Sequence, residues 1–507
     1  LLEELQPEQS LLPLFQVKFA LNPPWSNGRG MATVQLPDLT LTSLFGYIYH
    51  GSTKYDLTLV MREQDEGLGM VFDYNAELFD ASTIDRMLGH FKTLLEGIIV
   101  NPDQRITELP LLAQAEHQLQ QALLVQPLKA PILTGIDHYF LDQVIKTPDA
   151  TAVVCKDQRL SYQALNAQAN QLAHYLQMLG VKPGDLVGIC VDRSIAAIVG
   201  LLGILKAGAA YLPLDPDAQL ADRLDQGQVS WLLTQFNLTG VLEFNAISTL
   251  YLDKDWPQIS QKSTDNPTIH RTPGQAAYIV LESPDRGDRP QGITVSDRSV
   301  IQSAKFSPGL SFAIGENILQ LAPYTSGIAI FEIWGCLLNG AQLTIAPSEI
   351  LKLPTVESLA ALAAIIQQEK ITTLWLTESW FNRLVNRHLA VFSSVRQLLI
   401  GGTRWIGRTE ASQPLQKFRQ TFSQCQLIHT YSPDRSLPIA AYLPLPSDPS
   451  APPLALLPST YLLDRNLQRV PAGIPGELYV DAEGWTAIDR PNPRLIANPF
   501  SSSPDCN

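Results

Sequence analysis

Residues 161–179, SYQALNAQANQLAHYLQML, predict an amphipathic helix, and this helix decides how the surrounding chain folds. Its apolar residues recur at helical spacing on one face: Leu165, Ala169, Leu172 and Leu176. Ser161 is a suitable N-cap, and Gly180 is a suitable stop. The next segments predict a strand, an apolar helix and a second strand, at 186–191, 195–206 and 210–214. This order predicts an α/β fold with mostly parallel, helix-covered sheets.

Composition indicates a globular protein of more than one domain. The chain has 507 residues, of which 45% are hydrophobic and 17% charged, as in ordinary globular proteins. The net charge of −13 argues against a general nucleic-acid or membrane binder, although a local basic patch stays open. No apolar run could span a bilayer and no signal peptide opens the chain, so we expect a cytoplasmic protein. Five scattered cysteines are expected to be reduced core thiols: Cys155, Cys190, Cys336, Cys425 and Cys506.

The chain divides into three segments. Residues 1–108 combine alternating strand patterns with an amphipathic helix and predict an α+β unit. Residues 109–136 are rich in Leu, Gln, Ala and Pro and predict a linker. Residues 137–507 carry the βαβ pattern and predict a second, larger domain.

Four stretches of the first segment keep a characteristic order: PEQSLLPLFQVKF (7–19), KYDLTLVM (54–61), GLGMVFDYNAELFDASTIDRMLGHFKTLLEGI (67–98) and NPDQRITELPLL (101–112). They resemble the C-terminal end of the condensation domain of nonribosomal peptide synthetases. The condensing motif of that family, HHxxxDG, belongs upstream of Leu1. We therefore expect residues 1–108 to be a condensation-domain remnant that does not condense substrates by itself.

Four further stretches carry a second resemblance: LSYQALNAQANQLAHYL (160–176), LKAGAAYLPLDP (205–216), IFEIWGCLLNGAQLTIAP (330–347) and GELYVDAEGW (476–485). They resemble the large N-terminal subdomain of an AMP-forming adenylation domain. The resemblance implies a core that activates carboxylic acids with ATP and magnesium. It also implies neighbouring condensation, carrier and tailoring domains as partners. The chain stops soon after RLIANPFSS (494–502), so we expect it to lack the small C-terminal subdomain and assign no catalytic residue.

The phosphate-binding loop of that family, YTSGSTGKPKG, aligns with residues 277–292, AYIVLESPDRGDRPQG. Ser283, Gly287 and Gly292 are the nucleotide-binding positions that survive. Pro284 occupies a glycine position and removes a backbone donor. Glu282 and Asp285 replace hydroxyl residues, Gln291 replaces the lysine, and Asp288 adds a third acid to the loop. A carboxylate about 4 Å from a phosphate charge costs about 1–4 kcal/mol, which Arg286 and Arg289 offset only in part.

The adenine and magnesium motif of the family, NAYGPTE, aligns with HTYSPDR at 429–435. Tyr431, Pro433 and Asp434 are the candidate contacts of the adenine region. Arg435 stands where the resemblance implies a glutamate ligand, which reverses the charge at a position that needs a hard oxygen donor. We therefore predict no metal ligand here and no bound cofactor.

The substrate pocket is predicted around SGIAIFE, residues 326–332. By resemblance, Gly327, Ile328, Phe331 and Thr430 line it. Gly327 stands where amino-acid-activating members carry an aspartate for the α-ammonium group. Burying that ammonium without a counter-ion is very unfavourable, so an ordinary α-amino acid is disfavoured as substrate.

Two functional hypotheses remain. The first is a degenerate, pseudo-adenylation core that is kept as a structural and docking platform in the synthetase. The second is an active adenylation domain for a hydroxy, keto or aryl acid, which would use ATP and magnesium. A third hypothesis is that the cleft implied by the adenylation resemblance binds a different ligand, but no motif in the sequence supports it.

Overall fold

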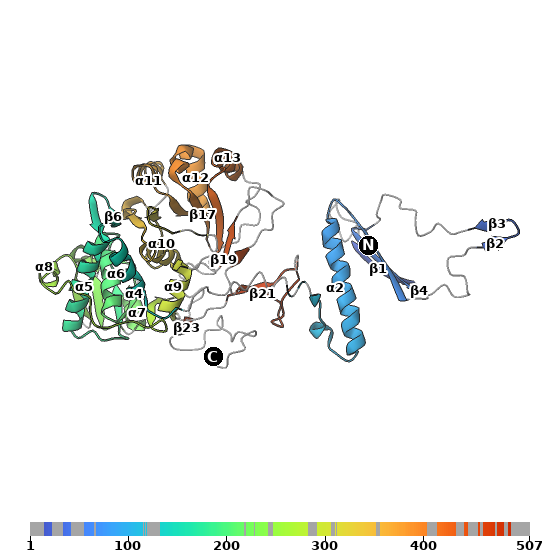
Figure 1. The fold of residues 1–507 in the computed structure, drawn as a ribbon, viewed down its shortest axis with the longest axis horizontal. Coiled ribbons are helices and arrows are strands. Elements are labelled where there is room, and N and C mark those ends of the chain that lie inside the picture. Colours follow the sequence, from blue (N-terminus) through green and yellow to red (C-terminus); the bar gives the residue numbers. More distant parts are fainter. Residues whose placement is uncertain are drawn as a thin grey trace. The chain divides into compact units, whose positions relative to one another are not determined.

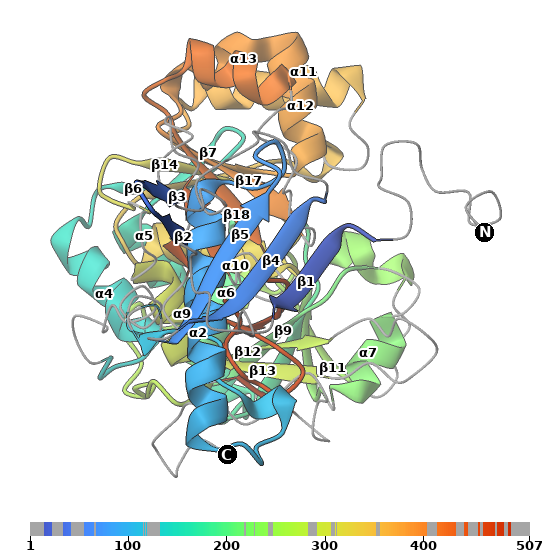
Figure 2. The same cartoon turned by 90° about the vertical axis from the view of Figure 1, so that its right-hand side faces the viewer.

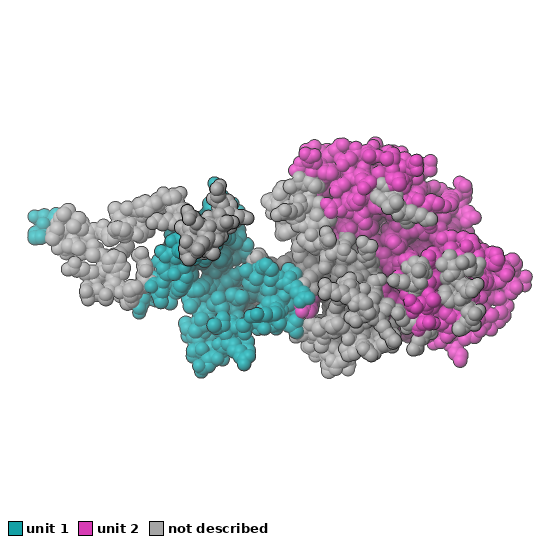
Figure 3. Space-filling view, turned by 180° about the vertical axis from the view of Figure 1, so that it is seen from behind, with its two compact units in different colours: residues 1–119, 462–477 teal, residues 120–461, 478–507 magenta. Residues whose placement is uncertain are grey.

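The computed structural model describes most of the chain. The described residues are 15–22, 34–41, 55–64, 67–114, 116, 118, 132–216, 220–227, 229–241, 247–281, 292–305, 310, 312–350, 355–402, 413–431, 441–444, 455–456, 460–471, 474–480 and 485–487. They fall into two compact units, which Figure 3 distinguishes by colour. Unit 1 comprises 1–119 and 462–477, and unit 2 comprises 120–461 and 478–507.

Unit 1 contains a small sheet and one long helix (Figure 2). Its described sheet has the order β1-β4-β5, formed by Val17–Asn22, Leu57–Gln64 and Gly67–Tyr74. The helix α2, Ala81–Val100, buries Ile84 and brings Phe91 within 6.4 Å of Phe19 on β1, ring centroid to ring centroid. Further elements are β2 (Val34–Leu36), β3 (Leu39–Leu41) and η1 (Ile106–Glu108). The predicted α+β character of the first segment is confirmed by these elements.

Residues 462–477, from far downstream in the sequence, belong to unit 1. Strands β21 (Thr460–Leu463) and β22 (Glu477–Val480) pair with each other. The side-chain amide of Asn466 between them donates to the carbonyl of Thr107, with Nδ2 3.3 Å from the oxygen. Residues 462–477 therefore pack with residues of the first segment, although the two are far apart in the sequence.

Unit 2 is built on two large sheets covered by helices (Figure 1). The first sheet has, among the described residues, the order β11-β10-β8-β9-β12-β13-β23. Its pairs are parallel from β11 to β12 and antiparallel beyond β12. The strands are β8 (Leu186–Ile189), β9 (Ala210–Pro213), β10 (Trp231–Thr234), β11 (Ser248–Tyr251), β12 (Ala276–Leu281), β13 (Gly292–Ser296) and β23 (Trp485–Ala487).

The second sheet has, again within the described part, the order β20-β19-β18-β17-β16-β14-β15-β6-β7. The central pairs from β18 to β6 are parallel, and the two edges are antiparallel. The strands are β6 (Thr151–Cys155), β7 (Gln158–Ser161), β14 (Asn317–Gln320), β15 (Gln342–Ile345), β16 (Thr373–Leu376), β17 (Gln397–Gly402), β18 (Gln426–Tyr431), β19 (Ala441–Pro444) and β20 (Ala455–Leu456). The predicted mostly parallel α/β fold is confirmed.

The helices of unit 2 fill the space between and around these sheets. Figure 1 shows α11, α12 and α13 grouped beside β17. The described helices are α4 (Ile136–Lys146), α5 (Tyr162–Met178), α6 (Ile195–Lys206), α7 (Leu220–Gln226), α8 (Trp256–Ile259), α9 (Asp297–Lys305), α10 (Gly327–Leu337), α11 (Val356–Gln368), α12 (Glu378–His388) and α13 (Gln413–Thr421). Short 3-10 turns complete them: η2 (Phe236–Val241), η3 (Ser348–Ile350) and η4 (Leu389–Ser394).

The helix predicted from residues 161–179 forms as α5 and packs against α6. The Ser161 side chain accepts a hydrogen bond from Ala164 N and caps the helix, and Gly180 follows its end with φ of +100°. Helix α6 contacts strands of both large sheets, which is why nearly all its residues are buried. Because Gly203 has no Cβ, α6 can approach Leu172 closely; a Cβ there would lie 2.6 Å from Leu172 Cδ2.

Two expectations from the composition can be compared with the structure. Cys155, Cys190, Cys336 and Cys425 are free cysteines, and the first three are buried. Cys506 lies outside the described residues. Within the described part of the chain, no helix combines the length and apolar character that a membrane span requires.

Candidate functional site

The candidate site lies at the carboxyl ends of the parallel strands of unit 2, where open α/β sheets bind ligands. Strands β14, β16, β17 and β18 are neighbours in one sheet, so their carboxyl ends share one edge. Thr430 and Tyr431 end β18, while α10 begins shortly after the end of β14. Gly292 begins β13 in the other sheet. The structure therefore gathers the substrate-pocket residues on one sheet and places the surviving loop glycine on the second.

Helix α10 presents the predicted pocket residues in its first turns. Ser326 caps it, with the side-chain oxygen accepting from Ile328 N at 3.2 Å. Gly327, Ile328 and Phe331 are all buried. The ring of Phe331 packs edge-on against Phe312, with centroids 5.0 Å apart. The start of α10 is apolar around Gly327, and the residue itself supplies no carboxylate.

Glu332 is a buried acid on α10 whose role the sequence alone did not reveal. Its Oε2 accepts hydrogen bonds from Leu321 N at 3.1 Å, Ala322 N at 3.0 Å and the Gln320 side-chain amide at 3.3 Å. Burial raises the pKa of the Glu332 carboxyl to about 8, although these donors and Arg193 pull it in the opposite direction. The carboxyl group is therefore committed to the backbone before α10 and is not presented to a ligand.

Arg193 is a second charged residue that the sequence motifs did not mark. It follows β8 and reaches the other sheet, donating from Nη1 to Gln320 Oε1 at 2.7 Å and from Nη2 to Leu321 O at 2.8 Å. Nη2 also donates to Ala322 O. The guanidinium lies over the ring of Tyr324, 5.6 Å from its centroid. No local signal marks this link, because Arg193 lies in the short segment between β8 and α6, where a charged residue is ordinarily exposed to solvent.

Thr430 is held from two sides at the end of β18. The indole Nε1 of Trp375 donates to Thr430 Oγ1 at 3.0 Å. On the neighbouring strand, Gly401 leaves room for the Thr430 backbone, because a Cβ at Gly401 would overlap the Thr430 carbonyl. Trp375, Ile328 and Phe331 belong to one buried apolar cluster. The structure thus shows that Thr430 and the α10 residues border a common core, through Trp375.

Strands β12 and β13 form the hairpin that carries residues 282–291. The predicted strand before the loop is confirmed as β12, and β13 pairs antiparallel with it, Leu281 opposite Gly292. Ser283 and Gly287 lie outside the described residues, as do Pro433, Asp434 and Arg435. For Tyr431 the structure describes the backbone, paired with Gly402 and Ala441. The predicted nucleotide-binding and metal positions therefore remain predictions.

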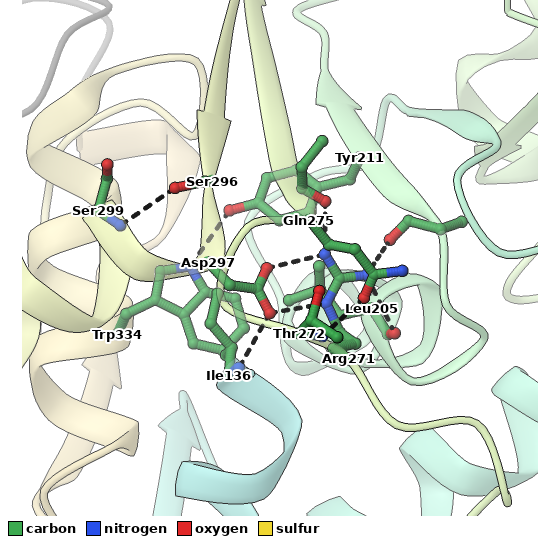
Figure 4. A network of polar contacts seen from close by, with 12 residues as sticks. Ile136, Leu205, Tyr211, Arg271, Thr272, Gln275, Ser296, Asp297, Ser299 and Trp334 are labelled. Atoms are coloured by element: carbon green, nitrogen blue, oxygen red, sulfur yellow. Dashed lines mark hydrogen bonds and ion pairs between the residues drawn. The ribbon is translucent and has the colours of Figure 1, made fainter. Parts of the chain in front are cut away.

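The base of the hairpin contains a buried ion pair, shown in Figure 4. Arg271 precedes β12 and Asp297 follows β13, and their closest charged atoms are 2.7 Å apart. No cluster of three or more His, Cys, Asp or Glu side chains suited to a metal ion occurs among the described residues. The described part of the site thus offers apolar contacts, a threonine hydroxyl and backbone groups as its chemistry.

Comparison with known proteins shows two family matches. Residues 140–487 match the AMP-binding enzyme family, and residues 1–121 match the condensation domain family. The chain is 36% identical over 522 residues to one subunit of the linear gramicidin synthase of Brevibacillus parabrevis, which covers 99% of this chain and 10% of that protein. It is 34% identical over 527 residues to the chondramide synthase of Chondromyces crocatus, covering 99% of this chain and 13% of that protein. The chain therefore spans a small fraction of the length of these two relatives.

Solved structures share the fold. The crystal structure of the nonribosomal peptide synthetase FmoA3 in its AMPPNP-bound form superimposes with a TM-score of 0.74 at 21% identity, over 91% of this chain and 50% of that one. The N-terminal subdomain of Klebsiella oxytoca NpsA, in complex with 3-hydroxybenzoyl-AMSN, gives 0.63 at 21% identity, over 75% of this chain and 94% of that one. At these identities the likeness establishes the architecture alone.

Proposed function

The chain belongs to the AMP-binding enzyme family, preceded by a condensation-domain segment, and from this premise we propose that its adenylation-type core is an impaired one, kept as a platform in a nonribosomal peptide synthetase. Its relatives include large synthetases that match it over 99% of its length. In this role the core folds, holds the spacing between neighbouring domains and offers them docking surfaces. It does not activate a carboxylic acid at a useful rate.

The observation that carries the proposal is a contrast within unit 2. The two sheets, α10 and the base of the hairpin are regular and tightly packed in the described residues. In the sequence, by contrast, the three places that should meet the ligands are changed: residues 282–291, Gly327 and Arg435. Acidic side chains near phosphates and an arginine at a metal-ligand position oppose Mg-ATP electrostatically. Selection for the fold without selection for the chemistry would produce this pattern.

One observation favours the alternative, an active core for a hydroxy, keto or aryl acid. The start of α10 has an apolar lining with Phe331 against Phe312, and Gly327 supplies no charge for an ammonium group. Such a pocket suits a carboxylic acid whose α-substituent is neutral. In that case ATP and magnesium would bind through residues 282–291 and the segment after Tyr431.

For either function we propose the same partners. They are the neighbouring synthetase domains: the condensation domain, a carrier protein and, where present, a tailoring domain. We propose a cytoplasmic location and expect neither nucleic acid nor membrane among the partners. The net charge of −13 supports this expectation.

The test is nucleotide binding followed by exchange. Calorimetry of the complete synthetase module with Mg-ATP is expected to show no binding in the micromolar range. ATP–pyrophosphate exchange with amino, hydroxy, keto and aryl acids is expected to stay at the level without acid. Micromolar Mg-ATP binding, with exchange stimulated by one of these acids, would refute the platform proposal and establish the alternative.

A restoration variant sharpens the test. It combines Pro284→Gly, Asp285→Ser, Gln291→Lys and Arg435→Glu, which return the donor, hydroxyl, lysine and ligand positions. If electrostatics at these positions caused the impairment, the variant recovers at least the unfavourable energy of about 1–4 kcal/mol that one carboxylate near a phosphate adds. Because about 1.4 kcal/mol is tenfold in affinity, we expect the Mg-ATP affinity to rise by one order of magnitude or more. A matched control carries Asp157→Ser in the exposed β6–β7 turn and Arg159→Glu on the exposed start of β7, and should leave Mg-ATP binding unchanged. Equal affinities in the parent and the restored protein would contradict the electrostatic explanation.

A further inference from the structure

Arg271 and Asp297 connect three segments that are distant in sequence (Figure 4). Asp297 Oδ2 accepts from Arg271 Nε at 2.9 Å, and Oδ1 accepts from Nη2 at 2.7 Å, which makes the pair bidentate. Asp297 Oδ2 also accepts from Ile136 N at 3.0 Å. Both charged side chains are essentially inaccessible, with exposed fractions of 1% for Arg271 and 0% for Asp297.

The remaining donors of Arg271 reach the core of unit 2. Nη1 donates to Ala209 O at 2.8 Å, just before β9, and Nη2 donates to Ala276 O at the start of β12. A backbone hydrogen bond also joins the two ends of the β12–β13 hairpin, because Asp297 N donates to Gln275 O at 2.9 Å. The guanidinium is thus shared between β9, β12 and Asp297 and is enclosed by them.

Asp297, which directly follows β13, caps the start of helix α4 with its side chain. The residue before α4 is Gly135, which has no side chain to cap the helix. Asp297 supplies both a hydrogen-bond acceptor for the first turn and a negative charge at the positive end of the helix dipole. Capping from 161 residues away is a tertiary contact that fixes where α4 begins.

Gly135 shows how close this approach is. Its backbone N donates to Arg271 O at 3.1 Å. A Cβ at Gly135 would overlap Arg271 Cβ and would lie 2.7 Å from Asp297 Oδ2 and 2.8 Å from Asp137 Oδ1. Only glycine at position 135 therefore lets the chain begin α4 along this path.

We propose that Arg271 and Asp297 are positioning residues that tie the start of α4, at Gly135–Ile136, to the base of the β12–β13 hairpin. The first turn of α4 and the base of β12 and β13 then lose and regain their hydrogen bonds together. This coupling holds whether or not the core activates a substrate, and it does not rest on the proposed function.

The test is native-state hydrogen exchange at the amides of α4 and of β12 and β13. Asp297→Asn removes the charge while keeping the size, and is expected to raise exchange at Ile136–Phe140 and at Gly292–Ser296 together, on the order of 100-fold, as expected for breaking a buried pair. Arg159→Met, which breaks the exposed pair with Glu369, is the matched control and should leave both segments unchanged.

A double variant separates positioning from general stability. Arg271→Met with Asp297→Leu replaces the pair by apolar side chains, which often restores the stability lost on breaking a buried pair. It cannot restore the bond to Ile136 N. We expect its midpoint of denaturation to return toward that of the parent while the first turn of α4 exchanges independently of the hairpin. Two results would overturn the proposal. One is that the first turn of α4 and the hairpin still exchange together in the double variant, and the other is that Asp297→Asn speeds exchange at the hairpin alone.

Discussion

The replacement Glu332→Gln tests the charge state of the buried acid beside the candidate pocket. Burial raises the pKa of the Glu332 carboxyl to about 8, from an ordinary value of 4.5. The group is therefore protonated in the folded protein at neutral pH, while it is ionised in the unfolded chain. Glutamine has the shape of the protonated acid, so its carbonyl oxygen can take the place of Oε2 and keep the bonds from Leu321 N and Ala322 N.

The magnitude follows from the two pKa values. A raised folded-state pKa stabilises the protein below pH 4.5, and this contribution is lost as the pH rises from 4.5 to about 8. The loss amounts to about 1.4 kcal/mol per pH unit, or about 5 kcal/mol across the window. Because glutamine does not titrate, the stability of Glu332→Gln relative to the parent should rise over the same window and level off above pH 8.

The assay is urea denaturation of the parent and the variant at pH 5, 6, 7 and 8, with Trp fluorescence as the measure of unfolding. Glu369→Gln, on the surface pair with Arg159, is the matched control and should show a difference below about 1 kcal/mol at every pH. The reasoning is refuted if Glu332→Gln is destabilised by several kcal/mol at pH 7 with a difference that does not change with pH. That result would mean that Glu332 is ionised and paired electrostatically with Arg193.

Two further changes test the packing of unit 2. Burial lowers the pKa of Lys206 to about 8 from 10.5, so its charged amine costs about 3 kcal/mol below pH 8, and this destabilisation fades as the pH rises to 10.5. Lys206→Met should therefore stabilise the protein at pH 7 and lose this advantage by pH 10. The loss of the Lys206 amine leaves no buried acceptor unpaired, because Asn266 Oδ1 still accepts from the amides of Asn166 and Asn170. Unfolding curves at the two pH values check this expectation, and a destabilised variant at pH 7 would contradict it. Gly401→Ala should destabilise by several kcal/mol in thermal unfolding, because its Cβ would overlap the Thr430 carbonyl, whereas Gly274→Ala meets open space and should change little.

Much of the fold follows from local sequence patterns. The helix from residue 161 and the buried helix at 195–206 form as predicted, because their capping residue and apolar spacing act over a few residues. The strand before the loop is also found where the apolar run predicts it. The packing of residues 462–477 with the first segment could not be predicted in this way. Thr107 is 359 residues from its partner Asn466, and no local signal specifies such a pairing.

The sequence marks the candidate site only where a motif lies, and the role of the marked residues stays a prediction. Gly327, Ile328 and Phe331 lie together on α10 as the motif suggests. Arg193 and Glu332 were missed because their importance depends on burial and on partners from another strand. The same holds for Asp297, whose contact with Ile136 spans 161 residues. A charged residue in a sequence looks like a solvent-exposed one until the fold shows that it is enclosed.

The positions of these buried polar groups bear on what the core can bind. Arg193 donates to the carbonyl groups at 320–322, Glu332 accepts from the amides of 321 and 322, and Arg271 pairs with Asp297. Each of these groups is already engaged by the protein, and moving one to a ligand would leave a buried partner unsatisfied. Arg193, Glu332 and the Arg271–Asp297 pair are therefore not available as counter-charges for a triphosphate and its metal ion. In the proposed impairment, the acids of 282–291 and Arg435 are the charges that oppose Mg-ATP, and the restoration variant tests them.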